Sequence, residues 1–371
     1  MADTVHVLGL GGVGVLVAHA LAGLSDRPRL NLLLHRPRDH YPGSLAITRN
    51  GDTEYQSNFT IEEYRAGRWF QRPSHGFVQP VMHTQCQEGS PNEIPIRFLL
   101  VAVKAHYTVD AIRLVKHRLT KDSTILFLQN GLGVLDELDA ELFPNPRERP
   151  SYLSGVVTHC IHRKGFLSAV HTSAGKIVLG TSPRIGSAPD ACLSVVPATD
   201  AGILAGILSR AHTLNASLQN PRELLQQQLI KLATNSIYNP LTALLGCSIN
   251  VLITSENLQI QAISDALIRE ISDVIKALPL SGMLSEEDLE AEFSRTKLKR
   301  IIRELGLRAG EHTTSMLQDI RNGVATEIMY LNGFFMRWGP MLGVDCPANE
   351  MITRMVLETE SRVTGRLSEC G

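Results

Sequence analysis

The chain has 371 residues, which is enough for two domains with substantial hydrophobic cores. Lys and Arg total 36 against 37 Asp and Glu, for a formal net charge of −1, and this balance argues against a general nucleic-acid binder. The six cysteines lie far apart without a C-x-x-C pair, which argues against a zinc knuckle or a disulfide framework and favours a reducing compartment.

The apolar run VHVLGLGGVGVLVAHALAGL at residues 5–24 predicts a buried strand, a glycine-rich turn and a helix. The turn has the pattern G-x-G-x-x-G between strand and helix, which is typical of a dinucleotide-binding site. Gly9 would take the sharp bend, Gly11 would let the backbone approach a pyrophosphate, and Gly14 would let the helix pack closely on the strand. The alternative is a purely structural glycine turn.

A membrane-spanning or targeting segment is not expected in this run. Spanning helices rarely hold glycines in this pattern, and Asp3, the only charge before the run, is negative where a signal peptide carries basic residues. The start also lacks the Arg- and Ser-rich, acid-free composition of a transit peptide. We therefore expect a cytoplasmic protein, with a mitochondrial location as the alternative.

The next apolar run, Leu30–His35, predicts a second buried strand, which ends in Arg36-Pro37-Arg38. In Rossmann domains an acidic residue near this point binds the ribose of NAD, whereas an arginine pairs with the 2′-phosphate of NADP. Arg36 therefore favours NADP, Arg38 is a candidate to share the role, and Asp39 leaves NAD open. The alternative is that Arg36 is a solvated charge.

Two further strands are predicted at residues 97–104 and 124–131, with a crossover helix at 105–119 between them. The first ends at Lys104 and the second at Gln129-Asn130-Gly131. Because ligands of open parallel sheets bind beyond the carboxyl ends of the strands, these polar side chains are candidate site residues. The alternatives are a plain charge at a strand end and an ordinary turn.

The chain changes character from Leu153 to Asn220. Three short glycine-separated segments, at 153–165, 166–175 and 176–182, predict antiparallel additions to the sheet. They are followed by a loop at 183–198, a helix at 201–210 and a strand at 214–218. His159, His162 and His171 lie here, but no carboxylate or thiolate spacing completes a metal site, so no metal is expected.

The helix that begins at Pro221 carries the most informative polar pattern. Lys231, Asn235 and Asn239 fall at i, i+4 and i+8 among apolar residues, which predicts a stripe lining a polar cavity, since burying an unpaired lysine is costly. Pro240 is expected to kink the helix and to free a carbonyl for another partner. The alternative is a solvated helix face.

Residues 311–336 predict one more helix with a buried apolar stripe. Ser315 and Glu327 are its candidate cavity residues, while Asp319 and Arg321 are interpreted as structural charges. Pattern alone does not separate Glu327 from a surface charge.

The blocks GLGGVG, LLLHR, LLVAVKA, LQNG, KLATNSIYNPLTALLG and SMLQDIRNGVATEIMYLNG, in this order, resemble the 2-dehydropantoate 2-reductase (ketopantoate reductase) family over most of the chain. The last two blocks are far more specific than the glycine motif. The resemblance implies an α/β fold, with a Rossmann-type domain at 1–220 and an all-helical domain at 221–371, and an active site in the cleft between them. It also implies NADPH-dependent reduction of 2-dehydropantoate to (R)-pantoate, on the route to pantothenate and coenzyme A.

The same resemblance assigns roles to the candidate residues. The glycine turn would hold the pyrophosphate, Lys231 would be the general acid, and Glu327 would be its acidic partner. The remaining roles are pyrophosphate binding by Gly9, Gly11, Gly12 and Gly14, 2′-phosphate binding by Arg36, cofactor and substrate contacts by Lys104 and Asn130, and substrate hydrogen bonds from Asn235, Asn239 and Ser315.

The chain departs from compact family members in a long connection at about 41–96, which includes the stretch EEYRAGRWFQRPSHGF with Arg65, Arg68, Trp69, Phe70 and Arg72. Long connections are often functional, so this one is interpreted as a lid, a homodimer contact or a docking patch, with a solvated excursion as the alternative. Two function classes therefore stay open. One is a reductase of 2-dehydropantoate or another branched 2-oxo acid, and the other is an interaction or assembly component that keeps the reductase fold.

Overall fold

The computed structural model describes residues 3–72, 91–183, 185, 199–280 and 282–369. By its internal contacts the chain divides into two units. The first runs to Gln129, resumes at Leu135–Ser182 and ends at Asn220, whereas the second contains the chain from Pro221 onward together with Asn130–Val134. The loop 130–134 therefore groups with the helical part of the chain, although it follows directly on a strand of the first unit.

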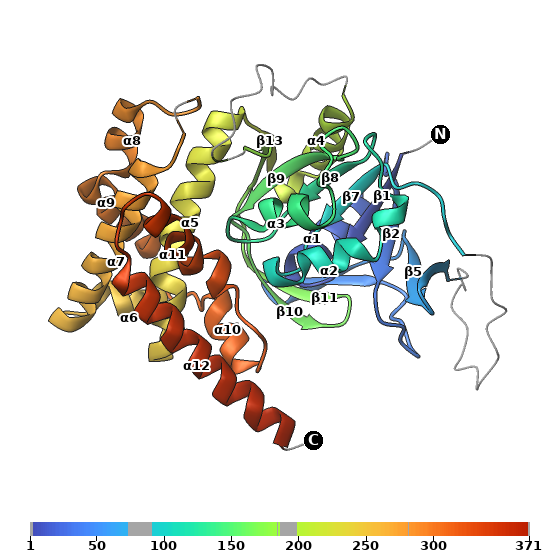
Figure 1. Ribbon diagram of the computed structural model, residues 1–371. Coiled ribbons are helices and arrows are strands. Elements are labelled where there is room, and N and C mark those ends of the chain that lie inside the picture. The colour runs from blue at the N-terminus through green and yellow to red at the C-terminus, as the bar shows by residue number, and fades with distance from the viewer. Residues whose placement is uncertain (1–2, 73–90, 184, 186–198, 281, 370–371) are drawn as a thin grey trace. The chain divides into compact units, whose positions relative to one another are not determined.

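Among the described residues of the first unit, nine strands form one sheet in the order β13-β12-β9-β8-β7-β1-β2-β5-β6 (Figure 1). The stretch from β5 to β9 is parallel throughout and has the doubly wound order of a Rossmann-type domain. Flanking it, β6 is antiparallel to β5 and β12 is antiparallel to β9, whereas β13 is parallel to β12. The strands are β1 Thr4–Leu8, β2 Arg29–Leu34, β5 Thr60–Arg65, β6 Arg68–Gln71, β7 Phe98–Val101, β8 Thr124–Phe127, β9 Ser151–Val157, β12 Ile177–Thr181 and β13 Ala216–Leu218.

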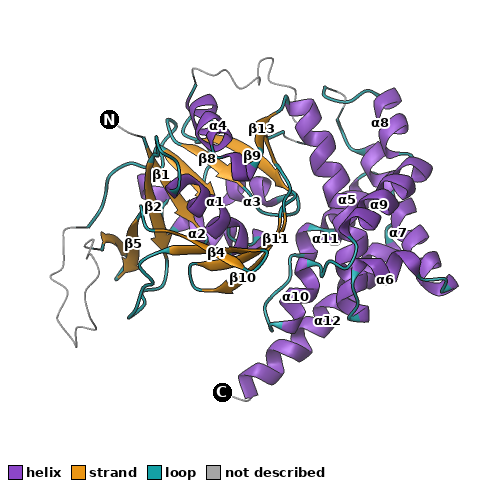
Figure 2. Cartoon of the chain, turned by 180° about the vertical axis from the view of Figure 1, so that it is seen from behind, coloured by secondary structure: helices purple, strands orange, loops and turns teal. Residues whose placement is uncertain are grey.

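A smaller sheet of β10 (Cys160–Gly165), β11 (Ser168–Ser173), β3 (Leu45–Arg49) and β4 (Asp52–Gln56) packs over helix α1 in the order β10-β11-β3-β4 (Figure 2). Successive side chains of the central strands alternate between two cores. In β7, Leu100 faces the core that contains α1, and Leu99 faces the core on the other side of the sheet. Burial on both faces explains why these strands appear in the sequence as continuous apolar runs. The helices of this unit are α1 Gly12–Ala22, η1 Ala105–Tyr107, α2 Thr108–Arg113, η2 Lys116–Arg118, α3 Val134–Glu141, α4 Asp200–Arg210 and η3 His212–Leu214.

The strands around the glycine motif confirm the sequence prediction, but the later ones end earlier than expected. β7 ends at Val101, three residues before Lys104, and β8 ends at Phe127 rather than Gly131. The expected helix at 105–119 is broken into η1, α2 and η2. The apolar periodicity did not indicate this break, nor that Arg118 in η2 is buried.

The segments after Leu153 differ from the predicted antiparallel additions. β9 pairs with β8 in parallel, and only β12 is antiparallel to β9. The segments β10 and β11 leave the main sheet and form the smaller one, where β11 pairs with β3 from the long connection. Alternation of side chains reveals a strand but not its direction or its partner, so the sequence could not distinguish these pairings.

The described part of the 41–96 connection supplies β3 to β6, and its side chains Leu45, Ile47 and Trp69 are buried, so it is not a solvated excursion. Trp69 is fully buried and donates from Nε1 to the Leu114 carbonyl at 2.8 Å, so it is a core residue and not a docking contact. Arg65 and Arg72 both pair with Glu63. Residues 73–77 of the basic and aromatic stretch, and most of the expected loop 183–198, lie outside the described residues.

A buried ionic cluster lies between β1, β2 and β5. The Glu62 carboxylate, which is completely buried, pairs with the Arg118 guanidinium and accepts from Asn92 Nδ2 at 2.8 Å. His6 Nε2 lies 3.8 Å from Glu62 Oε1. Burial, followed by the charge of Arg118, lowers the pKa of His6 to about 4, so this imidazole is neutral in the folded protein at neutral pH.

The second unit consists of helices (Figure 2). The long helix α5 is central to it, because α6, α7, α9, α10 and α12 all pack against it. The helices are α5 Pro221–Leu245, α6 Ile249–Thr254, α7 Leu258–Ala277, α8 Glu286–Phe293, α9 Arg295–Ala309, α10 Ser315–Arg321, η4 Ile328–Tyr330, α11 Asn332–Met341 and α12 Pro347–Glu369. None of the helices in the described part of the chain is both long and apolar enough to cross a membrane.

The single helix predicted at 311–336 is wrong: this region forms α10, η4 and α11 with a loop between α10 and η4. Gly323 adopts φ +61°, which is a left-handed conformation that ends α10. The Asn322-Gly323 pair is the sequence signal for this end, and the apolar stripe on either side obscured it.

Candidate active site

The three glycines of the motif have three different surroundings. Gly9 adopts φ +99°, and a Cβ added there would lie 2.5 Å from the Val103 backbone nitrogen. A Cβ added at Gly14 would lie 1.9 Å from the Gly9 carbonyl oxygen, so only glycine lets α1 approach the turn this closely. A Cβ at Gly11 would meet nothing within 4 Å, which leaves open space beside the N-terminus of α1.

This space suits the pyrophosphate of a dinucleotide. The turn follows β1, next to β7, where the strand order reverses, and Gly11 is the N-cap of α1 with no side-chain capping bond. The first N–H groups of α1 therefore have no side-chain cap, and such groups bind anions. Gly12 lies against β10 of the smaller sheet, because a Cβ there would be 3.3 Å from the Ile161 carbonyl oxygen.

The two basic residues after β2 differ in their contacts. Arg36 is exposed two residues beyond the end of β2, where a 2′-phosphate is predicted. The guanidinium of Arg38 stacks over the Phe166 ring, 4.3 Å from its centroid. Arg36 is therefore the better candidate of the two.

Lys104 and Gln129 are both placed at the carboxyl edge of the first unit's sheet. Lys104 is half-buried at the start of η1, and its carbonyl accepts from Tyr107 N at 2.9 Å. Gln129 donates to Thr108 Oγ1 at 3.1 Å and so links the chain after β8 to the helix after β7. The residue that follows, Asn130, belongs to the second unit.

In the second unit, Asn130 Nδ2 donates to Glu327 Oε2 at 3.2 Å. The Glu327 side chain is only 8 % exposed, so the surface-charge alternative is wrong. The backbone fixes this contact, because Leu132 N donates to the Tyr330 carbonyl at 3.1 Å, and a Cβ at Gly131 would lie 2.5 Å from that same carbonyl oxygen. The loop thus holds an amide against a buried carboxylate.

The polar stripe of α5 is confirmed as helical and is partly buried. Lys231 and Asn235 are half-buried, and Asn239 is buried. The helix continues through Pro240, and the carbonyl of Ser236, four residues earlier, accepts instead from Asn332 Nδ2 at 2.8 Å. The expected freed carbonyl is therefore present and has a side-chain partner.

Ser315 is exposed at the first position of α10. The residue before it, Thr314, caps the helix by accepting from Leu317 N at 3.3 Å, and its hydroxyl lies 2.6 Å from that of Thr242 on α5. This pair of hydroxyls ties α10 to α5 three residues beyond Asn239. Sequence reasoning missed Thr242 and Asn332, although each is a polar residue within an apolar stretch.

Two of the first unit's histidines, His159 and His171, are joined by a hydrogen bond. His171 Nδ1 accepts from Arg49 at 3.0 Å, and its Nε2 lies 3.0 Å from His159 Nδ1, which also accepts from Gly175 N. Burial lowers the pKa of both imidazoles. No group of three or more His, Cys, Asp or Glu in the described ranges is arranged to hold a metal ion.

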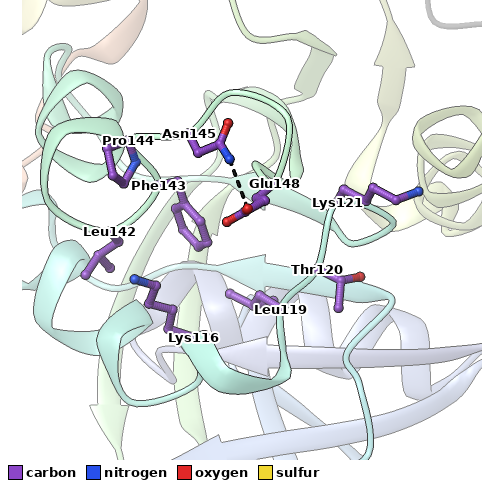
Figure 3. A pocket seen from close by; sticks show the side chains of 9 residues that line it. All are labelled: Lys116, Leu119, Thr120, Lys121, Leu142, Phe143, Pro144, Asn145 and Glu148. Carbon is purple, nitrogen blue, oxygen red and sulfur yellow. Dashed lines mark hydrogen bonds between the residues drawn. The ribbon is translucent and has the colours of Figure 1, made fainter.

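A pocket of about 480 Å³ in the first unit contains none of the predicted site residues (Figure 3). Its walls come from the chain before β8 and the chain before β9, so it lies at the edge of the sheet opposite the glycine turn. Its lining is Lys116, Leu119, Thr120, Lys121, Leu142, Phe143, Pro144, Asn145 and Glu148.

Two family profiles match the chain. The profile described as ketopantoate reductase PanE/ApbA matches residues 5–184, and the one described as ketopantoate reductase PanE/ApbA C terminal matches residues 223–360. Among curated proteins, the chain is 26 % identical to a probable 2-dehydropantoate 2-reductase of Schizosaccharomyces pombe, over 98 % of this chain and 97 % of that protein. It is also 24 % identical to a ketoisovalerate reductase of Beauveria bassiana, over 92 % of this chain and 79 % of that protein.

Solved structures share the fold. A ternary complex of D-mandelate dehydrogenase with NADH and anilino(oxo)acetate has a TM-score of 0.69 at 17 % identity, covering 97 % of this chain and 99 % of that one. A PanE/ApbA family ketopantoate reductase from Ralstonia eutropha JMP134 has a TM-score of 0.67 at 20 % identity, with the same coverage. Together with the glycine turn and the helical unit, the two profile matches establish that the chain belongs to the ketopantoate reductase family.

Proposed function

We propose that the chain is an NADPH-dependent 2-dehydropantoate 2-reductase that forms (R)-pantoate for pantothenate and coenzyme A synthesis. The observation that carries the proposal is the buried Glu327 carboxylate held by Asn130, in the same unit as the Lys231 stripe of α5. The buried carboxylate can accept a hydrogen bond from a hydroxyl of the substrate. The half-buried ammonium of Lys231 can donate one to its keto oxygen.

The cofactor would be held by the chain's first unit. Gly9, Gly11, Gly12 and Gly14 form the turn beside the open N-terminus of α1, where the pyrophosphate would receive backbone N–H donors. When bound, the reduced nicotinamide supplies a hydride for the C2 carbonyl of the keto acid. Lys104 would contact the cofactor from the loop after β7.

Lys231 would act on the oxygen of that carbonyl. Its ammonium donates a hydrogen bond to the ketone oxygen and polarises the C2 carbonyl. As negative charge develops on the oxygen, Nζ transfers a proton to it, so the product leaves as the hydroxy acid and Lys231 takes a new proton from water.

The other polar residues would position the substrate. Glu327 would accept from a substrate hydroxyl while Asn130 keeps the carboxylate oriented. Asn235, Asn239 and Ser315 would donate to or accept from the substrate's polar groups. Their amide and hydroxyl groups suit a branched hydroxy acid, which offers both donors and acceptors.

Arg36 supports NADPH over NADH, because an exposed guanidinium after β2 can pair with a 2′-phosphate in bidentate geometry. The solved D-mandelate dehydrogenase complex contains NADH, so both nucleotides belong in the assay. One relative is a ketoisovalerate reductase, so 2-ketoisovalerate is included as a control substrate. A similar solved structure is a dimeric ketopantoate reductase from Staphylococcus aureus, so we also propose a homodimer.

The test is steady-state oxidation of NADPH and NADH with 2-dehydropantoate, 2-ketoisovalerate and benzoylformate. We expect 2-dehydropantoate with NADPH to have the highest kcat/KM. A higher kcat/KM with another 2-oxo acid would reassign the substrate. An absence of turnover with all of them, together with a stable protein partner, would favour the assembly component instead.

A further inference from the structure

A buried amide holds the α5 helix at the point where Pro240 interrupts its hydrogen bonding. Pro240 has no N–H, so the Ser236 carbonyl loses its normal helical donor. Asn332 Nδ2 replaces that donor at 2.8 Å, and the Asn332 side chain is completely buried. A buried carbonyl without a donor would be destabilising, so this bond is needed for the local helix geometry.

The second proton of the same amide is also used. Asn332 Nδ2 donates to Asn349 Oδ1 at 3.0 Å, and Asn349 Nδ2 donates to Glu270 Oε2 at 2.8 Å. The Glu270 carboxylate also accepts from Ala348 N and Asn349 N, both at 2.9 Å, in the first turn of α12. Turning the Asn332 amide over would place its oxygen against two acceptors, so the network allows one orientation.

This network connects the two parts of the second unit that carry the proposed active-site groups. Asn332 comes five residues after Glu327, and the turn between them is closed by Tyr330 N donating to the Glu327 carbonyl at 2.9 Å. Ser236 directly follows Asn235 on α5. A single side chain therefore joins the Glu327 segment to the backbone of the polar stripe.

We propose that Asn332 is a positioning residue, which fixes the Glu327 carboxylate relative to Lys231, Asn235 and Asn239 through the Ser236 carbonyl. This role rests on the proposed function, because it matters for catalysis only if those groups bind the keto acid. Asn332 is completely buried in this network, so its effect is transmitted through Glu327 and α5.

The experiment separates positioning from simple stabilisation with two Asn332 variants, the reference variant Pro240→Ala and one control. Asn332→Ala removes both donor bonds. Asn332→Ala/Pro240→Ala restores an N–H to the Ser236 carbonyl, so the carbonyl is no longer orphaned, but the link to Glu327 is still missing. Thr353→Val removes another buried bond, from Thr353 Oγ1 to the Asn349 carbonyl at 2.7 Å, and keeps both Asn332 donor groups.

For Asn332→Ala we expect kcat/KM for 2-dehydropantoate to fall about 10- to 100-fold, the effect of misplacing a reacting group by about 1 Å. The Kd for NADPH should stay within about twofold of wild type. The double variant should regain thermal stability relative to Asn332→Ala, measured as Tm, but not kcat/KM. Thr353→Val should lower Tm without lowering kcat/KM.

Recovery of kcat/KM together with Tm in the double variant, judged against Pro240→Ala alone, would overturn the positioning role, as would full activity of Asn332→Ala. A wild-type chain that reduces no 2-oxo acid would instead overturn the proposed function. Hydrogen exchange at residues 327–331 gives a readout independent of substrate. It should accelerate in both Asn332 variants and not in Thr353→Val, and unchanged exchange would remove the link.

Discussion

Asn130 and Glu327, separated by 197 positions in the sequence, are joined by a hydrogen bond of 3.2 Å from the amide nitrogen to the carboxylate oxygen. The Glu327 carboxyl group is buried, where polar atoms need hydrogen-bond partners, and the Asn130 amide is one such partner. The pair links the strand-end motif LQNG to the motif around Glu327, the two blocks that sequence reasoning treated separately.

Glu327→Ala should produce a defect mainly on the substrate side. Loss of a hydrogen bond to a charged group corresponds to about 1.5–3 kcal/mol, so we expect KM for 2-dehydropantoate to rise about 10- to 100-fold, with or without a lower kcat. Steady-state kinetics with saturating NADPH measure it. Asn130→Ala should shift KM in the same direction, and kinetics equal to wild type in Glu327→Ala would remove this carboxylate from the site.

Lys231→Ala should abolish most of the turnover while leaving the cofactor site intact. General acid catalysis contributes about 10²- to 10⁴-fold, so kcat should fall by at least about 100-fold, whereas the Kd for NADPH from fluorescence titration should not change. Lys299→Ala, at an exposed lysine paired with Asp265, is the matched control and should keep full turnover. Wild-type turnover without Lys231 would exclude it as the acid.

Arg36→Glu should weaken the preference for NADPH over NADH. It removes a guanidinium from the proposed 2′-phosphate position and adds a negative charge, so kcat/KM for NADPH should fall at least about tenfold while that for NADH falls less. Arg38→Glu tests the alternative, since Arg38 stacks on Phe166. A larger loss of NADPH preference in Arg38→Glu would transfer the role to that residue.

Gly11 and Gly14 should fail in different ways when changed to alanine. A Cβ at Gly14 would lie 1.9 Å from the Gly9 carbonyl oxygen, so Gly14→Ala should lose about 1–3 kcal/mol of unfolding free energy in urea titrations. A Cβ at Gly11 meets no protein atom within 4 Å, so Gly11→Ala should stay folded and bind NADPH at least about tenfold more weakly. Unchanged NADPH binding in Gly11→Ala would place the pyrophosphate elsewhere.

His6 should make the protein less stable in acid. Its pKa is lowered from 6.5 to about 4 in the folded state, so between these pH values the unfolded chain binds a proton that the folded one does not. The contribution of His6 to the free energy of unfolding is complete above pH 6.5 and is lost as the pH falls through about 4. The total loss is about 3 kcal/mol of unfolding free energy.

Urea titrations from pH 8 to 4.5 measure this loss. His6→Gln should reduce the pH dependence of the unfolding free energy by the amount that His6 contributes. His40→Gln, at an exposed position, should leave the pH dependence unchanged. The other buried histidines whose pKa is lowered by burial, His19, His159 and His171, keep part of the slope in both variants. Identical slopes in wild type and His6→Gln would contradict the assignment.

Features set by local sequence were predictable, and features set by distant partners were not. The glycine turn and the α5 stripe follow from short-range rules of backbone conformation and helical period. The direction of β9, the burial of Trp69 and the short helices before Arg118 depend on contacts between segments far apart in the chain, such as Arg118 with Glu62. The role of Asn332 could not be predicted for the same reason, although Pro240 indicated that a carbonyl of α5 needs another donor.

The assignment of residues 130–134 to the helical unit bears on any attempt to divide the protein. A fragment that begins at Pro221 would lack residues 130–134. It would therefore lose the hydrogen bond from Leu132 N to the Tyr330 carbonyl and the one from Asn130 Nδ2 to the Glu327 carboxylate. A synthetic peptide of sequence QNGLGV, residues 129–134, would supply both missing donors. Segments of the two units therefore alternate along the sequence, and fusing or swapping the helical unit requires moving the five residues 130–134 along with it.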